Sequence, residues 1–270
     1  MSSGEHSHKV TPKGTAMQFN SQTTIENVVE KSFTVDDVPG VLWAPAAPCE
    51  PTPLVLMGHP GGLHKRAPGL VARATRLVSS FGFRVAAIDA PGHGERQRSA
   101  SDSAWVDRMQ RARRAGEHLG AIVSEFNASI AERAVPEWRA TLDALEALDE
   151  VDSGRPVGYS GMTLATEIGF RLAAADERIG ALGLGAAFAS DALEDVARRV
   201  AAPVLYLLPW DDQEIDRDSG LALFDAIGAT DKVLHVFPGP HERVPSFEAD
   251  DAARFLARHL MPEVESGQSM

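Results

Sequence analysis

The chain has 270 residues, of which 44% are hydrophobic and 24% are charged. This composition is typical of a globular protein and excludes the disordered, collagen-like and disulfide-scaffold classes. The formal net charge of −12 opposes binding to phosphate backbones and anionic lipid, and the longest apolar run is too short to cross a bilayer. We therefore expect a small-molecule partner, with no nucleic acid and no membrane.

The first 22 residues are polar and lack periodicity, which predicts a mobile N-terminal arm over 1–22. No apolar stretch typical of a secretory signal lies near residue 1. Cys49 is the single cysteine, so no disulfide can form within the chain, and a reducing cytoplasm fits best. The excess of Arg over Lys hints at a high-GC bacterial source.

A single domain is expected over 23–262, with a short tail over 263–270. Residues 25–44 predict two or three short antiparallel strands around the turn at 36–40. Apolar runs and helical patterns then alternate; the expected strands are 53–57, 84–88, 156–159, 179–184, 203–208 and 232–237, and the expected helices are 69–80, 165–175, 190–200, 220–227 and 246–260. This alternation predicts an α/β fold with a mostly parallel, doubly wound sheet that is covered on both faces.

More than sixty residues separate the expected strands at 84–88 and 156–159, several times a usual connection. Apolar residues recur in this stretch at helical spacing. We expect a helical cap over 96–135, above the carboxyl ends of the strands where open α/β sheets bind ligands. Helices that only pad the sheet are an equal alternative. Pro136 is suited to the first turn of a separate helix that would run to about 148.

Unusual residues follow two of the expected strands. Gly58-His-Pro-Gly-Gly62 places two glycines after the first buried strand, where the backbone N–H of Gly61 or Gly62 could approach a ligand oxygen. Pro60 has no N–H to offer. Asp89-Ala-Pro-Gly-His-Gly-Glu95 follows the second strand, and His93 within it is expected to be structural.

The corner after the strand at 156–159 offers two candidate nucleophiles. A nucleophile on a sharp strand-to-helix turn needs small residues two positions before and two positions after it. Ser160 has Gly158 before it but the bulky Met162 after it, whereas Thr163 lies between Gly161 and Ala165. The steric rule favours Thr163.

An acid and a histidine follow the last two strands of the expected sheet. Asp211 and Asp212 are adjacent candidates for the acid, with Asp212 slightly favoured by position, and His241 follows the next strand. Nucleophile, acid and then histidine is the chain order of an α/β-hydrolase triad. Trp210 either lines a pocket or packs as an ordinary aromatic side chain.

These motifs together resemble the α/β-hydrolase superfamily, and within it the bacterial branch of dienelactone hydrolases and small esterases. The resemblance extends from about residue 40 to residue 260. Relatives read Gly-Leu-Ser-Met-Gly-Thr at the nucleophile corner, so Gly161-Met-Thr-Leu-Ala-Thr166 places Thr163 where the family keeps its serine.

The resemblance implies hydrolysis of an ester, thioester or lactone. Thr163 attacks, His241 accepts its proton, Asp212 orients His241, and the backbone N–H groups of Gly61 and Leu164 hold the oxyanion. The expected substrate pocket has four residues: His59, Gly62, Trp105 and Trp210.

Two alternatives remain open at this point. Ser160 is an alternative nucleophile, because the β-branch of Thr163 crowds the corner. The second alternative is that the pocket belongs to a lyase, a cyclase or a small-molecule binder that uses His241 and Asp212 for acid–base chemistry. No metal and no organic cofactor is expected, and the sequence leaves a homodimer open.

Overall fold

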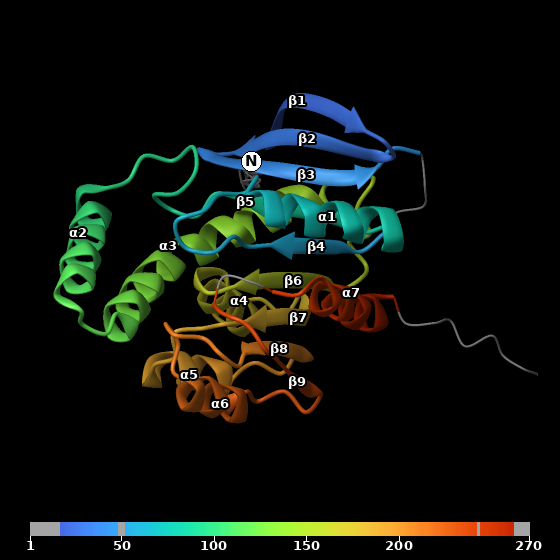
Figure 1. Cartoon of the computed structure of the whole chain (residues 1–270). Helices are drawn as coiled ribbons and strands as arrows, with labels where there is room; N and C mark the ends of the chain where they lie inside the picture. The colour runs from blue at the N-terminus through green and yellow to red at the C-terminus, as the bar shows by residue number, and fades with distance from the viewer. Residues whose placement is uncertain (1–16, 48–51, 242–243, 262–270) are drawn as a thin grey trace, which may run out of the picture.

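A nine-stranded sheet forms the centre of the protein (Figure 1). The structure is a computed structural model that describes residues 17–47, 52–241 and 244–261. The strands are β1 (Met17–Ile25), β2 (Val28–Val35), β3 (Val38–Pro45), β4 (Leu54–Met57), β5 (Arg84–Ile88), β6 (Val157–Met162), β7 (Ile179–Gly185), β8 (Val204–Pro209) and β9 (Lys232–Phe237). Their order in the sheet is β1-β2-β3-β5-β4-β6-β7-β8-β9.

The first four strands of this order pair antiparallel and the others pair parallel. Strands β4, β5, β6 and β8 are buried at every residue, as expected for parallel strands covered on both faces. The predicted α/β class, with its antiparallel N-terminal portion, is confirmed.

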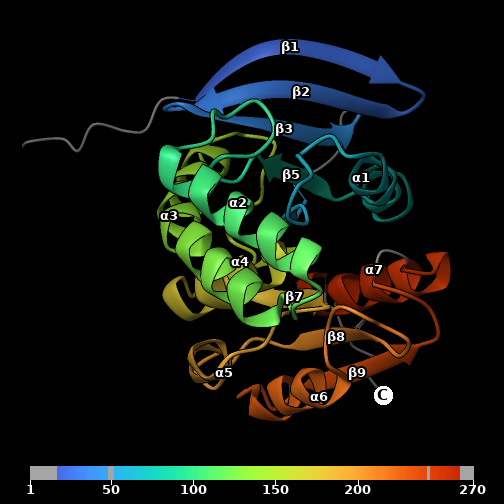
Figure 2. The same ribbon diagram turned by 60° about the vertical axis from the view of Figure 1, so that its left-hand side comes forward.

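Seven helices accompany the sheet in the described parts of the chain. They are α1 (Pro68–Phe81), α2 (Ala100–Ala115), α3 (Gly120–Glu146), α4 (Leu164–Ala175), α5 (Asp191–Ala197), α6 (Arg217–Ala226) and α7 (Ser246–Leu260). Helices α1 and α7 lie together on one face, and α3 to α6 follow one another along the other (Figure 2). None of the helices in the described ranges has the length and apolarity that a membrane crossing requires.

Helix α2 and the first turns of α3 stand beyond the carboxyl ends of β4 and β6 (Figure 1). Helix α2 begins at a capping box, in which the Ser99 side chain accepts from the Asp102 N–H and the Asp102 carboxylate accepts from the Ser99 N–H. It packs against α3. The two helices therefore form a cap at the edge of the sheet where α/β proteins bind ligands.

The separate helix expected from Pro136 does not exist, because α3 continues through that residue to Glu146. A proline inside a helix loses one hydrogen bond and costs about 3 kcal/mol. The apolar face of α3 is continuous across it: Phe126 and Ile130 precede Pro136, and Trp138 and Leu142 follow it, all buried. This burial outweighs the local cost, so one rigid element joins the cap to the sheet.

The predicted arm is wrong for residues 17–22, which belong to β1. Strand β1 pairs with β2 through its backbone, and its side chains after Met17 are exposed. An exposed edge strand of this kind carries no apolar periodicity, which is why the sequence did not reveal it. The rest of the arm, Cys49 and the predicted tail lie outside the described residues.

Candidate active site

Thr163 occupies the corner between the end of β6 and the start of α4. Its backbone has φ 56° and ψ −112°, a region that a β-branched residue adopts only under strain. Strain of this kind costs about 1–3 kcal/mol and concentrates at functional sites. The Thr163 side chain is half-buried and lines two cavities.

Small residues on both sides of Thr163 make this corner possible. A Cβ placed on Gly161 would lie 2.4 Å from the Cβ of Ala165. The Thr166 hydroxyl donates to the Gly185 carbonyl at 2.6 Å and accepts from the Gly185 N–H at 3.0 Å. The Thr163 N–H also donates to the Gly185 carbonyl, at 3.1 Å. Strand β7 therefore holds the strained turn in place.

Ser160 lies within β6, and its side chain is on the face of the sheet that α1 and α7 cover. It borders a small cavity of about 30 Å³ with residues of α1 and α7, including Leu77, Ala252 and Leu256. It does not line either cavity that Thr163 lines. Adjacent positions of a strand alternate between faces, so its neighbour Tyr159 packs instead against Trp138 of α3.

Asp212 and His241 form a hydrogen-bonded pair beside this corner. The distance from His241 Nδ1 to Asp212 Oδ2 is 2.8 Å, and the Asp212 side chain is only 3% exposed. The other carboxylate oxygen of Asp212 accepts from the N–H groups of Glu214 and Ile215, at 2.8 and 3.0 Å. Asp211 has a different partner, since it accepts from the Gly239 N–H at 3.0 Å. Of the two adjacent acids, Asp212 is the one bonded to histidine.

Two backbone N–H groups lie near Thr163. Leu164 is the first residue of α4, and the N–H groups of a first helical turn have no partner inside the helix. Gly61 follows β4, and a Cβ on it would lie 3.9 Å from the Leu164 Cβ. Gly61 and Leu164 therefore lie side by side, as an oxyanion hole requires.

The loop that carries Gly61 is anchored to the loop after β5. Asp89 is fully buried and accepts from the Lys65 N–H at 2.9 Å and from Lys65 Nζ at 2.6 Å. The Glu95 N–H donates to Asp89 as well, at 3.0 Å. Burial by itself would raise the pKa of Asp89, but these hydrogen bonds lower it overall. The ionised carboxylate thus fixes both loops.

His59 is buried between these two loops and lines neither of the two cavities at Thr163. Its Nε2 accepts from the Ala90 N–H at 3.0 Å, so the ring proton lies on Nδ1, 2.8 Å from the Pro60 carbonyl oxygen. Burial lowers the pKa of His59 to about 4, so the ring is neutral at pH 7. His59 therefore links the loop that carries Gly61 to the loop after β5.

Two cavities meet at the site. One, of about 870 Å³, extends between α1 and the start of α7, and the other, of about 350 Å³, lies under the cap. Five residues line both: Gly61, Arg113, Thr163, Glu214 and His241. The predicted nucleophile and histidine therefore share one open space, with a chamber on either side.

The remaining predicted pocket residues have different positions. Gly62 lines the cap cavity, but neither tryptophan borders either of the two cavities. Trp105 stacks on Phe126 at 6.0 Å between ring centroids and so supports the wall from behind. Trp210 is 41% exposed and is covered by the Arg217 guanidinium, 3.6 Å from its ring.

The sequence did not single out Phe188 or Glu214 as site residues. The Phe188 ring lies 5.7 Å from the His241 ring and lines the cap cavity, and Glu214 lines both cavities. Phe188 follows β7 as Thr163 follows β6, so an inspection of every strand end would have found it.

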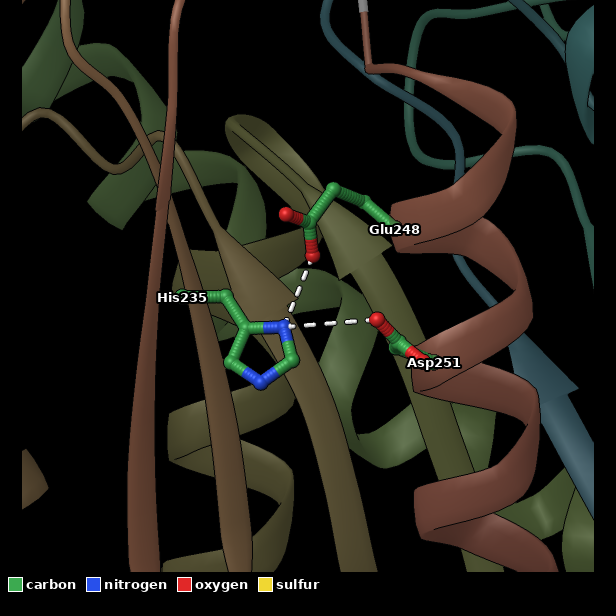
Figure 3. Close-up of side chains that lie close together, drawn as sticks. All are labelled: His235, Glu248 and Asp251. Atoms are coloured by element: carbon green, nitrogen blue, oxygen red, sulfur yellow. Dashed lines mark hydrogen bonds and ion pairs between the residues drawn. The ribbon is translucent and has the colours of Figure 1, made fainter.

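His235, Glu248 and Asp251 form a cluster between β9 and α7 (Figure 3). His235 Nδ1 lies 2.8 Å from Glu248 Oε2 and 4.0 Å from Asp251 Oδ2. Asp251 is also paired with Arg254. The cluster borders neither cavity at Thr163, and its side chains already satisfy one another.

Comparisons with known proteins agree with this geometry. No protein-family model and no curated protein matches the chain. Among solved structures, the PEG-bound complex of a cold-adapted esterase from an Arctic intertidal metagenomic library is 34% identical, with a TM-score of 0.71 over 90% of this chain and 99% of that chain. A zinc-bound structure of a cold-adapted esterase from such a library is 30% identical, with a TM-score of 0.65 over the same shares.

The fold also matches the acetyl xylan esterase from Paenibacillus sp. R4, at 14% identity and a TM-score of 0.66 over 92% of this chain and 90% of that chain. This more distant likeness concerns the fold alone. The identity and coverage of the Arctic enzyme establish the relationship. The chain belongs to the esterases of the α/β-hydrolase fold.

Proposed function

We propose that the protein hydrolyses carboxylic esters, including thioesters and lactones, with Thr163 as the nucleophile. The observation that carries this proposal is the strained backbone of Thr163 at a corner that faces the same space as His241. A strained β-branched residue is costly to keep. A nucleophile on a sharp turn is a functional reason to keep it.

In the proposed reaction, Thr163 Oγ1 attacks the carbonyl carbon and its proton passes to His241 Nε2. Nδ1 of His241 is engaged by Asp212, so Nε2 is the nitrogen left to accept the proton. The N–H groups of Gly61 and Leu164 stabilise the oxyanion. The carbonyl–oxygen or carbonyl–sulfur bond then breaks, and the leaving group takes the proton from His241.

Water completes the cycle by the same steps in reverse order. His241 removes a proton from water, the hydroxide attacks the acyl group on Thr163, and Thr163 recovers its proton from His241. The γ-methyl of Thr163 restricts χ1 at this crowded corner. We therefore infer slower acylation than a serine would give at the same position.

The sequence motifs support a narrower substrate class. We propose a small-molecule carbonyl substrate of the kind that dienelactone hydrolases and small esterases accept. We also propose that the protein acts in a reducing cytoplasm, which its single cysteine favours.

The experiment is hydrolysis of 4-nitrophenyl butyrate, a thioester analogue and a lactone by the wild type and four variants. Thr163→Ala and His241→Ala are expected to lose about 10³-fold or more in kcat/KM, and Asp212→Asn to lose nearly as much. Ser160→Ala is expected to keep wild-type activity. Loss of activity in Ser160→Ala alone would overturn the assignment, and a folded wild type that hydrolyses none of the three would indicate a lyase, a cyclase or a binder.

A further inference from the structure

Two polar side chains in the cap cavity are buried and have an unused hydrogen-bonding atom. Asn127 on α3 is 6% exposed and His93 after β5 is 8% exposed. Both line the cap cavity together with Thr163 and His241. Most of the other walls are apolar, formed by residues that include Val106, Met109, Val123, Phe126, Ile130 and Phe188. Four further polar residues also line the cavity: Arg98, Gln110, Arg113 and Glu214.

The unused atom of His93 is its Nε2. His93 Nδ1 lies 3.0 Å from the Pro91 carbonyl oxygen, and a carbonyl oxygen only accepts, so Nδ1 carries the ring proton. Burial lowers the pKa of His93, which keeps the ring neutral at pH 7. Nε2 is therefore an acceptor, and it has no hydrogen-bond partner among the described residues.

Asn127 supplies the complementary group. Its amide has no hydrogen-bond partner within the described ranges, but the amide is not fully sealed from solvent. The amide therefore faces the cavity space. A buried polar side chain without a protein partner is uncommon, and such groups occur chiefly at functional sites.

We propose that the cap cavity binds a hydroxyl group carried on the apolar arm of the ester substrate. The hydroxyl donates to His93 Nε2 and its oxygen accepts from the Asn127 amide. A carboxylate suits this pair less well, because it has no proton for the His93 acceptor. This inference rests on the proposed function for its kinetic test, and on binding alone for its second test.

The kinetic test compares 4-nitrophenyl esters of plain alkanoic acids with their ω-hydroxy counterparts, from six to ten carbons. The wild type is expected to prefer the hydroxy ester of one chain length by about tenfold or more in kcat/KM, because a site built to bond a hydroxyl leaves buried groups unpaired without it. Asn127→Leu is expected to abolish this preference, because the hydroxy ester loses the amide that its hydroxyl bonds.

Gln110→Leu is the matched control. Gln110 lines the same cavity, but it is exposed and its side-chain oxygen already accepts from Arg114. This variant is expected to keep the preference. Asn127→Leu is also expected to melt at or above the wild-type temperature, since it replaces an unpaired amide by an apolar group of similar size. A wild type without preference at every length, or an Asn127→Leu enzyme that keeps it, would overturn the proposal.

The binding test separates this inference from the proposed hydrolysis. Thermal shift of Thr163→Ala with ω-hydroxyalkanamides and plain alkanamides of the same lengths needs no turnover. A larger shift with one hydroxy amide, lost when Asn127→Leu is added, supports the hydroxyl subsite even if no ester is hydrolysed. Equal shifts with both series would reject the subsite even in an active esterase.

Discussion

Thr163 is the residue on which the proposed chemistry depends. Its positive φ is a cost that the neighbouring chain must offset, and the hydrogen bonds from Thr163 and Thr166 to Gly185 do so. Thr163 lines the same open space as His241. Backbone strain and the proposed nucleophile thus coincide at one position.

Replacing Thr163 separates stability from activity. Thr163→Gly is expected to abolish ester hydrolysis and to raise the free energy of unfolding by about 1 kcal/mol, because glycine adopts positive φ without strain at some entropic cost. Thr163→Ser is expected to raise kcat several-fold, since it keeps the hydroxyl and removes the methyl. Chemical denaturation and steady-state kinetics measure both, and a glycine variant less stable than the wild type would contradict the strain argument.

The two adjacent aspartates are expected to differ in their effect on activity. Asp212→Asn should lower kcat roughly 10³–10⁴-fold, because an amide bonded to Nδ1 favours the wrong tautomer of His241. Asp211→Asn keeps an oxygen that can accept from the Gly239 N–H, so its kcat should stay within about threefold of the wild type. Steady-state kinetics at pH 7.5 gives the comparison, and equal losses in the two variants would refute the assignment of the acid.

At the scale of elements, the close packing of the end of β6 against the start of α4 determines the geometry of the corner at Thr163. Gly161→Ala places a methyl against Ala165, so it should cost about 1–3 kcal/mol of stability and lower kcat as the corner shifts. Gly120→Ala is the matched control, because Gly120 begins α3 and a Cβ there meets nothing within 4 Å. It should be neutral or slightly stabilising. Urea denaturation of both variants decides, and a harmless Gly161→Ala would show that the corner is not tightly packed.

The sequence predicts elements well where the signal is local. The runs that became β5 and β9 and the pattern that became α7 have the expected bounds, because buried strands and amphipathic helices show in their own residues. The helix boundary expected at Pro136 was wrong because the cost of the proline is local, while the packing that offsets it involves Trp138 and the sheet. Strand β1 was not predicted in full because its exposed side chains show no apolar periodicity, and its pairing with β2 is not a local signal.

In the candidate site, too, local patterns indicate some residues, and only long-range packing reveals the others. The steric rule for a strand-to-helix corner selected Thr163, and strand ends indicated Asp212 and His241. The orientation of Trp210 away from the cavities and the cap cavity with Asn127 depend on how distant segments pack. No local pattern contains that information.

At the scale of the whole molecule, buried titratable groups make stability depend on pH. Burial lowers the pKa of His59 to about 4, from 6.5. Between these values the unfolded chain binds a proton that the folded protein does not, so stability falls as pH falls from about 6.5 towards 4. The contribution is fully present above the unfolded value.

His59→Gln isolates this contribution, because glutamine does not titrate. Between pH 7 and 4.5 the wild type should lose about 2–3 kcal/mol more unfolding free energy than the variant. The exposed His64 supplies the control, and His64→Gln should follow the wild-type pH dependence. Denaturant unfolding at each pH measures the difference, and parallel curves for wild type and His59→Gln would show that His59 is not a buried neutral group.

The central claim is that Thr163 is an activated nucleophile, and covalent labelling tests it most directly. The purified protein is treated with a fluorophosphonate, and the modified residue is found by intact mass and peptide mapping. We predict one phosphonyl group on Thr163, absent in His241→Ala. A label on Ser160, or no label on a sample shown to be folded, would contradict the account.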